Sequence, residues 1–329
     1  LAAGFIQLGF QLPFLRIERR LPRPRGVAKG EEDRGGSAGV GRVFTLMLPA
    51  VFGVSVAQIN LLVNTILASF LVTGSVSWLY YSDRLMEFPL GVFGIALATV
   101  ILPALSTQVA GNSTGIYFRT IDWALGLVVI VTIPAMVALA SLAYPLMVVL
   151  FHYGEFSSHD ALMASYSLMA FSPGLLGFVM VKVLAPGFYA RKDTRTPVRV
   201  GMVAMLVNAL AAGVLTLVFQ LGHVGLALAT SISGLLNAVL LYHYLARDTG
   251  YRPGIGGNQG AGRSSWGVFV AKIVLASAIM GAVLLQVTGD PQGWVSSSVI
   301  ERAGRLMMGI VLGSVEHLVC LYLLGIRLH

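Results

Sequence analysis

The chain has 329 residues, of which 56% are apolar and 11% charged, and its mean hydropathy is +0.81. Soluble domains carry about 25% charged residues, so this composition excludes an ordinary soluble domain. Lys and Arg exceed Asp and Glu by 22 to 14, yet the long charge-free stretches 43–82, 123–154 and 200–246 indicate a membrane protein and exclude a nucleic-acid-binding one.

The chain opens with two segments of contrasting character. Residues 1–15 are apolar but shorter than the roughly 20 residues of a spanning helix. We expect them to be the tail of a transmembrane helix in an N-terminally truncated chain. Residues 16–42 combine basic residues with Gly and Pro, which is typical of a linker. We expect a basic cytoplasmic linker there.

The rest of the chain divides into eight expected transmembrane helices at charged and Pro/Gly-rich positions. A polar segment, 247–264, separates the last two helices from the six before it. We therefore expect a six-helix lobe at 43–246, a second cytoplasmic linker, and a pair of helices within 265–329. The expected helices are 43–72, 75–106, 120–150, 160–189, 197–219, 223–246, 265–287 and 304–326, with kinks favoured at Pro49, Pro89, Pro134 and Pro173.

Basic residues lie in alternate connections between these helices. The connections 16–42, 190–199 and 247–264 are rich in Lys and Arg, whereas 151–160 and 220–223 contain neither. Positive charge favours the cytoplasmic side of a membrane, so this pattern predicts a cytoplasmic C-terminus.

The helix expected at 75–106 carries three charges close to Pro89. Asp83, Arg84 and Glu87 enter the span after aromatic residues that are typical of a membrane interface, namely Trp78, Tyr80 and Tyr81. Arg84 and Glu87 are three residues apart and can share a helix face as an ion pair. Either the pair only holds a kinked helix in place, or Arg84 lines an aqueous cavity and binds an anion. We favour the cavity, because intramembrane ionisable residues usually mark functional sites.

Other polar residues interrupt the later helices. Lys182 either extends toward the cytoplasm or faces the cavity, whereas Lys272 is close enough to its helix end to favour the first arrangement. Asn64 and Asn208 favour hydrogen bonds between helices.

The final helix has an unusual polar pair, Glu316 and His317, within an apolar run. Either they face the interior of the helix pair or a groove, or this end of the chain departs from the pattern of the family named below. The single cysteine, Cys320, excludes a disulfide within one chain, and the spacing of Cys and His residues predicts neither a metal site nor a cofactor.

Four segments resemble the lipid II flippase family, MurJ or MviN. They are LMLPAVFGVSVAQINLLVNTILASFL (46–71), SWLYYSDRLMEFPLGVFGIALATVILPALS (77–106), LFHYGEFSSHDA (150–161) and KVLAPGFYARKDTRTPV (182–198). The matches are long and ordered along the chain, and the resemblance is clear from about residue 42 to 246.

The resemblance implies an all-α polytopic membrane protein of the multidrug/oligosaccharidyl-lipid/polysaccharide exporter (MOP) superfamily. In that fold two six-helix lobes surround a central cavity, and this chain would hold the second lobe plus two additional C-terminal transmembrane helices. The implied function is alternating-access transport of lipid II, an undecaprenyl-pyrophosphate-linked precursor, from the inner to the outer leaflet of the bacterial cytoplasmic membrane. The implied partners are lipid II, the phospholipid bilayer and the missing N-terminal lobe, without which this chain is expected to be inactive.

The resemblance also implies roles for single residues. Arg84 matches the family's cavity arginine, with Asp83 and Glu87 as acidic neighbours, and Lys182 is a further candidate for substrate binding. Some members bind sodium in this lobe through carboxylates, but Asn64 and Asn208 are amides here, which disfavours a sodium site. No catalytic residue is expected, because the family is a carrier and not an enzyme.

Two further functions stay open. A drug/cation antiporter or another polyprenyl-lipid flippase of the same superfamily would share the fold. A membrane enzyme acting on polyprenyl phosphates would need clustered carboxylates for magnesium or a His or Ser nucleophile, for which Asp83 and Glu87 are the only weak candidates.

Overall fold

The computed structural model describes residues 58–251 and 263–326, all of them within one compact unit, Leu48–His329. Every regular element in this described part is a helix, and seven helices are long and apolar enough to cross a membrane. The expected half-helix 1–15 and linker 16–42 lie outside the described residues, as do the start of the first expected helix and most of the second linker.

The helices follow the chain with short connections. The first described helix is Gln58–Ser69. It is followed by α3 (Ser75–Pro89), the π-helix η1 (Leu90–Ile95), α4 (Ala96–Ala110), α5 (Thr114–Ser141), α6 (Ala143–Phe151), α7 (Ser158–Ala190), α8 (Arg195–Gly213), the π-helix η2 (Val214–Val218), α9 (Gly222–Thr249), α10 (Arg263–Thr288), α11 (Pro291–Ser296) and α12 (Val299–Leu323).

The prediction of one continuous helix over 120–150 is wrong. α5 ends at Ser141 and α6 starts at Ala143, because the backbone of Leu142 leaves the helical conformation (φ −97°, ψ 13°). Pro134 lies inside α5 and does not end it. The short helix α11 was also not expected, although Asp290 caps it and Pro291 occupies its first position, as is common at helix starts.

The irregularity expected at Pro89 is present as a π-helical segment. Pro89 ends α3, and η1 follows directly before α4 continues the same span to Ala110. Proline removes one backbone donor and clashes with the carbonyl four residues earlier, so a widened turn beside it relieves the helix. Such single-turn π segments are frequent at functional sites.

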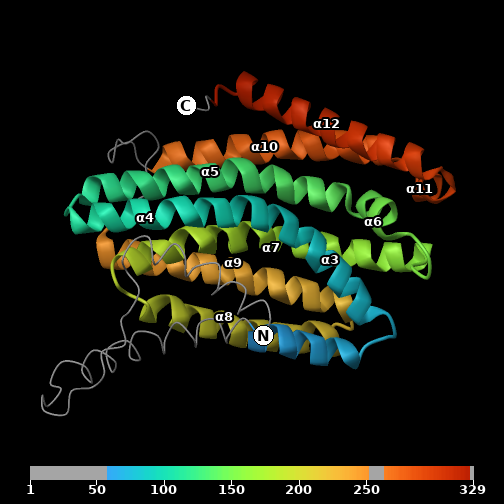
Figure 1. The fold of residues 1–329 in the computed structure, drawn as a ribbon, viewed down its shortest axis with the longest axis horizontal. Helices are drawn as coiled ribbons and strands as arrows, with labels where there is room; N and C mark the ends of the chain where they lie inside the picture. Colours follow the sequence, from blue (N-terminus) through green and yellow to red (C-terminus); the bar gives the residue numbers. More distant parts are fainter. Residues whose placement is uncertain (1–57, 252–262, 327–329) are drawn as a thin grey trace, which may run out of the picture. The chain divides into compact units, whose positions relative to one another are not determined.

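α7 is the central helix of this unit (Figure 1). It contacts α3, α4, α5, α6 and α9, while α10 packs on α5 and α12 packs on α10. α7 and α9 approach closely at glycines: a Cβ on Gly177 would lie 2.5 Å from the backbone of Gly234. Small residues permit such close packing in membranes, where lipid supplies no hydrophobic drive between helices.

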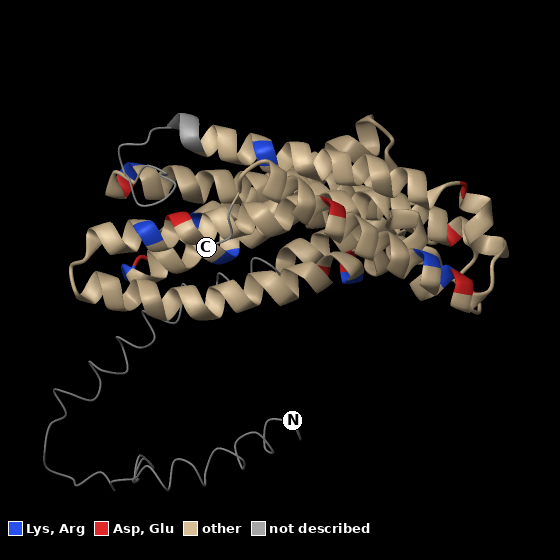
Figure 2. Ribbon diagram, turned by 90° about the horizontal axis from the view of Figure 1, so that it is seen from above, with Lys and Arg blue, Asp and Glu red and all other residues tan. Residues whose placement is uncertain are grey.

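Charged residues lie mostly near the ends of the helices, as Figure 2 shows. The middle of the bundle is largely free of Lys, Arg, Asp and Glu, apart from a few turns. Charged side chains within a membrane span must form pairs or reach water, so the few charged turns are candidates for a functional site.

Candidate functional site

One face of α3 docks the helix onto α7. Trp78, Ser82, Met86 and Pro89 recur every three or four residues and are all buried. The Ser82 hydroxyl donates a 2.7 Å hydrogen bond to the carbonyl of Ala164 in α7. The rotation of α3 about its axis is therefore fixed, and so is the direction of its charged side chains.

Two of the charged residues predicted for the site, Arg84 and Glu87, lie on the opposite face of α3. Arg84 Nη1 and Glu87 Oε2 form a 2.6 Å ion pair, and the Arg84 guanidinium lies 5.0 Å from the centre of the Tyr80 ring. The two charged side chains are 52% and 48% exposed. Arg84 follows the start of the span at Ser75 by nine residues, which is about 13 Å along a helix. The pair thus lies well inside the span, with about half of its surface left open by the described residues.

Asp83 is turned part of the way toward the core. It is partly buried, and it forms neither a hydrogen bond nor an ion pair with any described residue. Asp83 and Glu87 are four residues apart and are neighbours on the helix surface, so the Asp83 carboxyl lies within electrostatic reach of the Arg84–Glu87 pair without bonding to it.

Lys182 lies beside η1 and not beside Arg84. Its side chain is exposed on α7, and a Cβ on Gly94 would lie 3.4 Å from Lys182 Cγ. No hydrogen bond or ion pair in the described part of the chain links Lys182 to Arg84 or Glu87. Whether it belongs to the same site stays a prediction.

The prediction that Trp78 belongs to a belt of interfacial aromatic residues is wrong. It is only 5% exposed, and its Nε1 donates a 2.8 Å hydrogen bond to Asp160 Oδ1. Its ring also contacts that of His223, with the centroids 4.8 Å apart. Tyr80 is exposed, as expected, whereas Tyr81 packs against Phe151 and Phe156.

A hydrogen bond between helices links Asn64 and Asn208, as expected. Asn208 Nδ2 donates to Asn60 Oδ1 at 2.7 Å and to Asn64 Oδ1 at 2.9 Å, and Asn64 Nδ2 donates to Thr230 Oγ1 at 3.1 Å. The cluster connects the helix Gln58–Ser69 with α8 and α9. Sequence analysis missed Asn60 and Thr230, although the position of Asn60 one turn before Asn64 is a detectable sign.

The chemistry of this amide cluster gives no strong cation site. Its oxygens belong to carboxamides and a hydroxyl, and hard cations prefer carboxylates. Within the described residues, no three His, Cys, Asp or Glu side chains lie close enough to hold a metal ion. The sodium site at Asn64 and Asn208 stays a disfavoured prediction.

Two polar residues of the C-terminal helices, His317 and Lys272, lie at the contact between α10 and α12. His317 is 6% exposed and lies near the backbone of Ala276, so it faces the interior of the pair. Glu316 accepts a 2.9 Å hydrogen bond from Cys320 Sγ. Lys272 Nζ donates a 2.7 Å hydrogen bond to the carbonyl of Leu324, where a cation complements the C-terminal end of α12.

Comparisons with known proteins agree on one family. The family model described as lipid II flippase MurJ matches residues 1–303. A probable lipid II flippase MurJ of Vibrio cholerae is 47% identical over 326 residues, which cover 99% of this chain and 58% of that protein. One of Haemophilus influenzae is 42% identical over 332 residues, covering 99% and 61%. The chain thus spans about three fifths of the length of these relatives.

Two solved structures show the fold. A structure described as lipid II flippase MurJ in an inward closed conformation matches 97% of this chain and 61% of its own, with a TM-score of 0.68 and 24% identity. An outward-facing multidrug resistance transporter of the MATE family and MOP superfamily matches 84% and 63%, with a TM-score of 0.56 and 16% identity. The described helices therefore have the architecture of one part of a MOP-type transporter.

Proposed function

The chain belongs to the lipid II flippase MurJ family, and from this premise we propose that it forms part of a carrier that moves lipid II from the inner to the outer leaflet of the bacterial cytoplasmic membrane. The chain is a multi-pass membrane protein, since residues 58–251 and 263–326 alone contain seven candidate spans. Because it spans about three fifths of its relatives, the transport activity of a whole flippase is assigned here by proposal.

The observation that carries this proposal is the direction of Arg84. The buried face of α3 is committed to α7, so the ion pair of Arg84 and Glu87 has to face away from the core of this unit. Charges inside a span usually face a bundle interior or a water-filled cavity, and we propose that this face lines the transport cavity.

The chemistry of the pair suits a diphosphate. A guanidinium stays charged and offers a planar pair of donors to phosphate oxygens, so Arg84 would bind the anionic headgroup of lipid II. Glu87 competes for the same guanidinium at 2.6 Å, which orients it and weakens its hold on the ligand enough for release. Asp83 and Lys182 are further cavity candidates, Lys182 as a second cation about 12 Å from the end of α7.

Transport by this arrangement needs no covalent step. The headgroup would enter a hydrated cavity between this lobe and a second one, pair with Arg84, and be released outside when the lobes rock about the site. The apolar tail would stay in the bilayer, along a groove formed by α10 and α12. We accordingly assign residues 43–246 to one lobe and residues 265–329 to the helix pair.

The orientation in the membrane follows from the basic connections. Arg191, Lys192, Arg195 and Arg199 cluster between α7 and the start of α8, and the positive-inside rule places that end in the cytoplasm. The C-terminus after α12 would lie on the same side. The Arg84–Glu87 pair and Pro89 would then lie in the outer half of the membrane, and η1 near its middle.

The test is Arg84→Ala in the complete product of the gene, in cells depleted of their own flippase. We measure the fraction of lipid II that a membrane-impermeant degrading enzyme can reach from outside. We expect this fraction to fall to the level of cells without a flippase, while membrane insertion is unchanged and Arg199→Ala transports normally. Near-normal transport by Arg84→Ala would defeat the assignment.

A further inference from the structure

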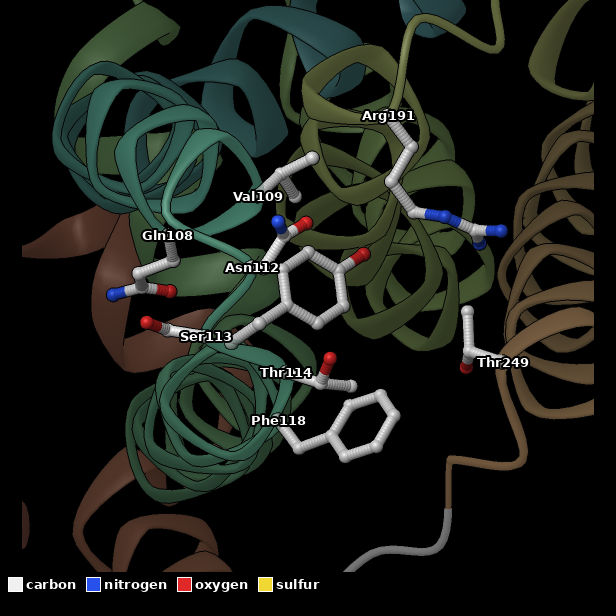
Figure 3. A pocket seen from close by; sticks show the side chains of 9 residues that line it. Gln108, Val109, Asn112, Ser113, Thr114, Phe118, Arg191 and Thr249 are labelled. Carbon is white, nitrogen blue, oxygen red and sulfur yellow. The ribbon is translucent and has the colours of Figure 1, made fainter.

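A second site lies at the opposite end of the bundle from the start of α3. A cavity of about 170 Å³ lies where the turn between α4 and α5 meets the C-terminal ends of α7 and α9. Figure 3 shows the side chains around it, with Arg191 and Thr249 on one side and Ser113 and Thr114 on the other. The lining residues are Gln108, Val109, Asn112, Ser113, Thr114, Tyr117, Phe118, Arg191 and Thr249.

The cation of this cavity, Arg191, lines it together with a buried tyrosine. Tyr117 is 3% exposed and its hydroxyl donates a 3.0 Å hydrogen bond to the carbonyl of Gly187. Arg191 lies near enough to the same hydroxyl to interact with it electrostatically. Among the described residues Arg191 forms no ion pair. Its charge therefore lies at the cavity, and the Asp193 carboxylate, which interacts with it electrostatically, does not line the cavity.

The carboxylates nearest to this region are occupied elsewhere and do not line the cavity. Asp193 accepts hydrogen bonds from the backbone N–H groups of Arg195 and Thr196, at the start of α8. Asp122 accepts a hydrogen bond from the Tyr251 hydroxyl. The lining therefore contains one positive charge and no negative charge, which favours an anionic ligand.

The opposite wall adds hydrogen-bond donors. The Ser113 hydroxyl donates to the carbonyl of Gly111 and does not cap α5. The backbone N–H groups of Thr114 and Gly115 thus have no acceptor among the described residues. The side chains of Asn112 and Thr114 also line the cavity. A helix start alone does not specify a ligand, but here Arg191 lines the same partly open cavity.

The volume limits the kind of anion. Pockets that enclose drug-sized ligands measure about 300–1,000 Å³, so a cavity of 170 Å³ suits one small group and is too small for a sugar or a peptide. Guanidinium, amide and backbone N–H donors around such a space match the oxygens of a phosphate.

We propose that this cavity binds one phosphate group, presented either by a membrane lipid headgroup or by free phosphate. The site is separate from the Arg84–Glu87 pair and does not depend on lipid II transport. Its position beside the basic connection between α7 and α8 places it at membrane-surface depth, where lipid phosphates are abundant.

The first arm of the test uses inorganic phosphate and the full chain in an uncharged detergent. We expect Arg191→Gln to weaken phosphate binding about ten- to a hundredfold, because a hydrogen bond to a charged group usually contributes that much to affinity. Asn112→Asp places a negative charge in the cavity with almost no change of shape, and it should abolish binding while the chain stays folded. The matched control is Arg199→Gln. Arg199 is also an exposed cation at this end of the bundle, but it does not line the cavity, so its loss should change the affinity less than about twofold.

The second arm tests a lipid source. The same variants are reconstituted in nanodiscs that contain phosphatidylglycerol, and the lipid retained after transfer to detergent is counted by mass spectrometry. Loss of retained lipid in Arg191→Gln and Asn112→Asp, but not in Arg199→Gln, supports the site with a headgroup as its ligand, even if free phosphate binds weakly. The proposal is overturned if these two variants match the unmodified chain in both arms, or if Arg199→Gln has the same effect as Arg191→Gln.

Discussion

The indole of Trp78 donates a 2.8 Å hydrogen bond to the carboxylate of Asp160, which joins the first turns of α3 and α7. Asp160 also completes a capping box with Ser157 at the start of α7, so one carboxylate serves both helices. This contact fixes the end of the helix that carries Arg84. The position of the charged face of α3 therefore depends on a buried aromatic residue two turns away.

We predict that Trp78→Phe lowers the thermal stability of the chain in detergent without removing the fold. The substitution loses the hydrogen bond to Asp160 and part of the ring contact with His223, and we expect a cost of about 1–3 kcal/mol. Tyr80→Phe is the matched control, because Tyr80 is exposed on the other face. An equal shift in the melting temperature for both variants would contradict this account.

We predict that Glu87→Gln separates substrate binding from transport. Removing the charge that faces Arg84 at 2.6 Å should leave the guanidinium free to hold the diphosphate more tightly, so release slows. Crosslinking to a photoreactive lipid II analogue should increase, while the appearance of lipid II outside decreases severalfold. If both quantities decrease together, Glu87 is required for binding and does not moderate it.

We predict that Asn208→Ala destabilises the contact among the helix Gln58–Ser69, α8 and α9. Asn208 is fully buried and donates to two amide oxygens, each of which would be left without this donor, at a cost of about 1–3 kcal/mol. A double-mutant cycle with Asn64→Ala should give a coupling of about 0.5 kcal/mol or more, and strictly additive effects would show that the two side chains act independently.

We predict that Gly177→Ala disrupts the packing of α7 on α9. The added methyl would lie 2.5 Å from the backbone of Gly234, which cannot move without shifting α9. The matched control is Gly126→Ala within α5, where nothing lies within 4 Å and alanine is the better helix former by about 1 kcal/mol. The melting temperature should fall for the first variant and hold or rise for the second. A fall of the same size in both would argue against the close approach.

We predict an acid-dependent loss of stability through Asp193. Burial raises the pKa of this carboxyl, but hydrogen bonds from the Thr196 hydroxyl and from the N–H groups of Thr196 and Arg195 outweigh it, and the pKa lies below its ordinary value of 3.8. The ionised form is thus favoured in the folded chain. Its contribution is present above pH 3.8 and is lost as the pH falls through the lower pKa of the folded state.

The variant Asp193→Ala measures the same contribution. It should lose about 0.5–2 kcal/mol at neutral pH, as expected for a helix cap. The difference from the unmodified chain should shrink as the pH falls below 4 in thermal unfolding experiments, because the unmodified carboxyl becomes protonated there. A difference that stays constant with pH would show that the cap does not depend on ionisation.

Much of the fold was predictable because membrane spans are encoded locally. Every backbone polar group in a bilayer must be satisfied within a helix, so a charge-free apolar run has few alternatives. The expected boundaries of α7 and α9 differ from the observed ones by only a few residues. The break at Leu142 was missed, although Pro145 is a detectable signal. Proline cannot donate to the carbonyl four residues earlier and clashes with it, and here that carbonyl belongs to Ser141, the last residue of α5.

The partners of polar residues were less accessible to sequence analysis. Arg84 and Glu87 are three residues apart, so helix geometry alone suggested their pairing. Trp78 looked like an interfacial residue because its neighbours Tyr80 and Tyr81 are aromatic too, and nothing in that segment indicated Asp160, 82 residues later, as its partner. Thr230 was missed for the same reason, because it lies 166 residues from its partner Asn64.

The sequence by itself determined that this is a multi-span helical membrane protein of one family, with an arginine inside a span, because hydropathy, charge placement and long ordered motifs are properties of the chain order. Only the tertiary structure decided which way each polar side chain faces. That choice depends on helix rotation and on contacts between distant segments: it turned Trp78 inward, joined Asn208 to Asn60 and Asn64, and brought Arg191 to the start of α5.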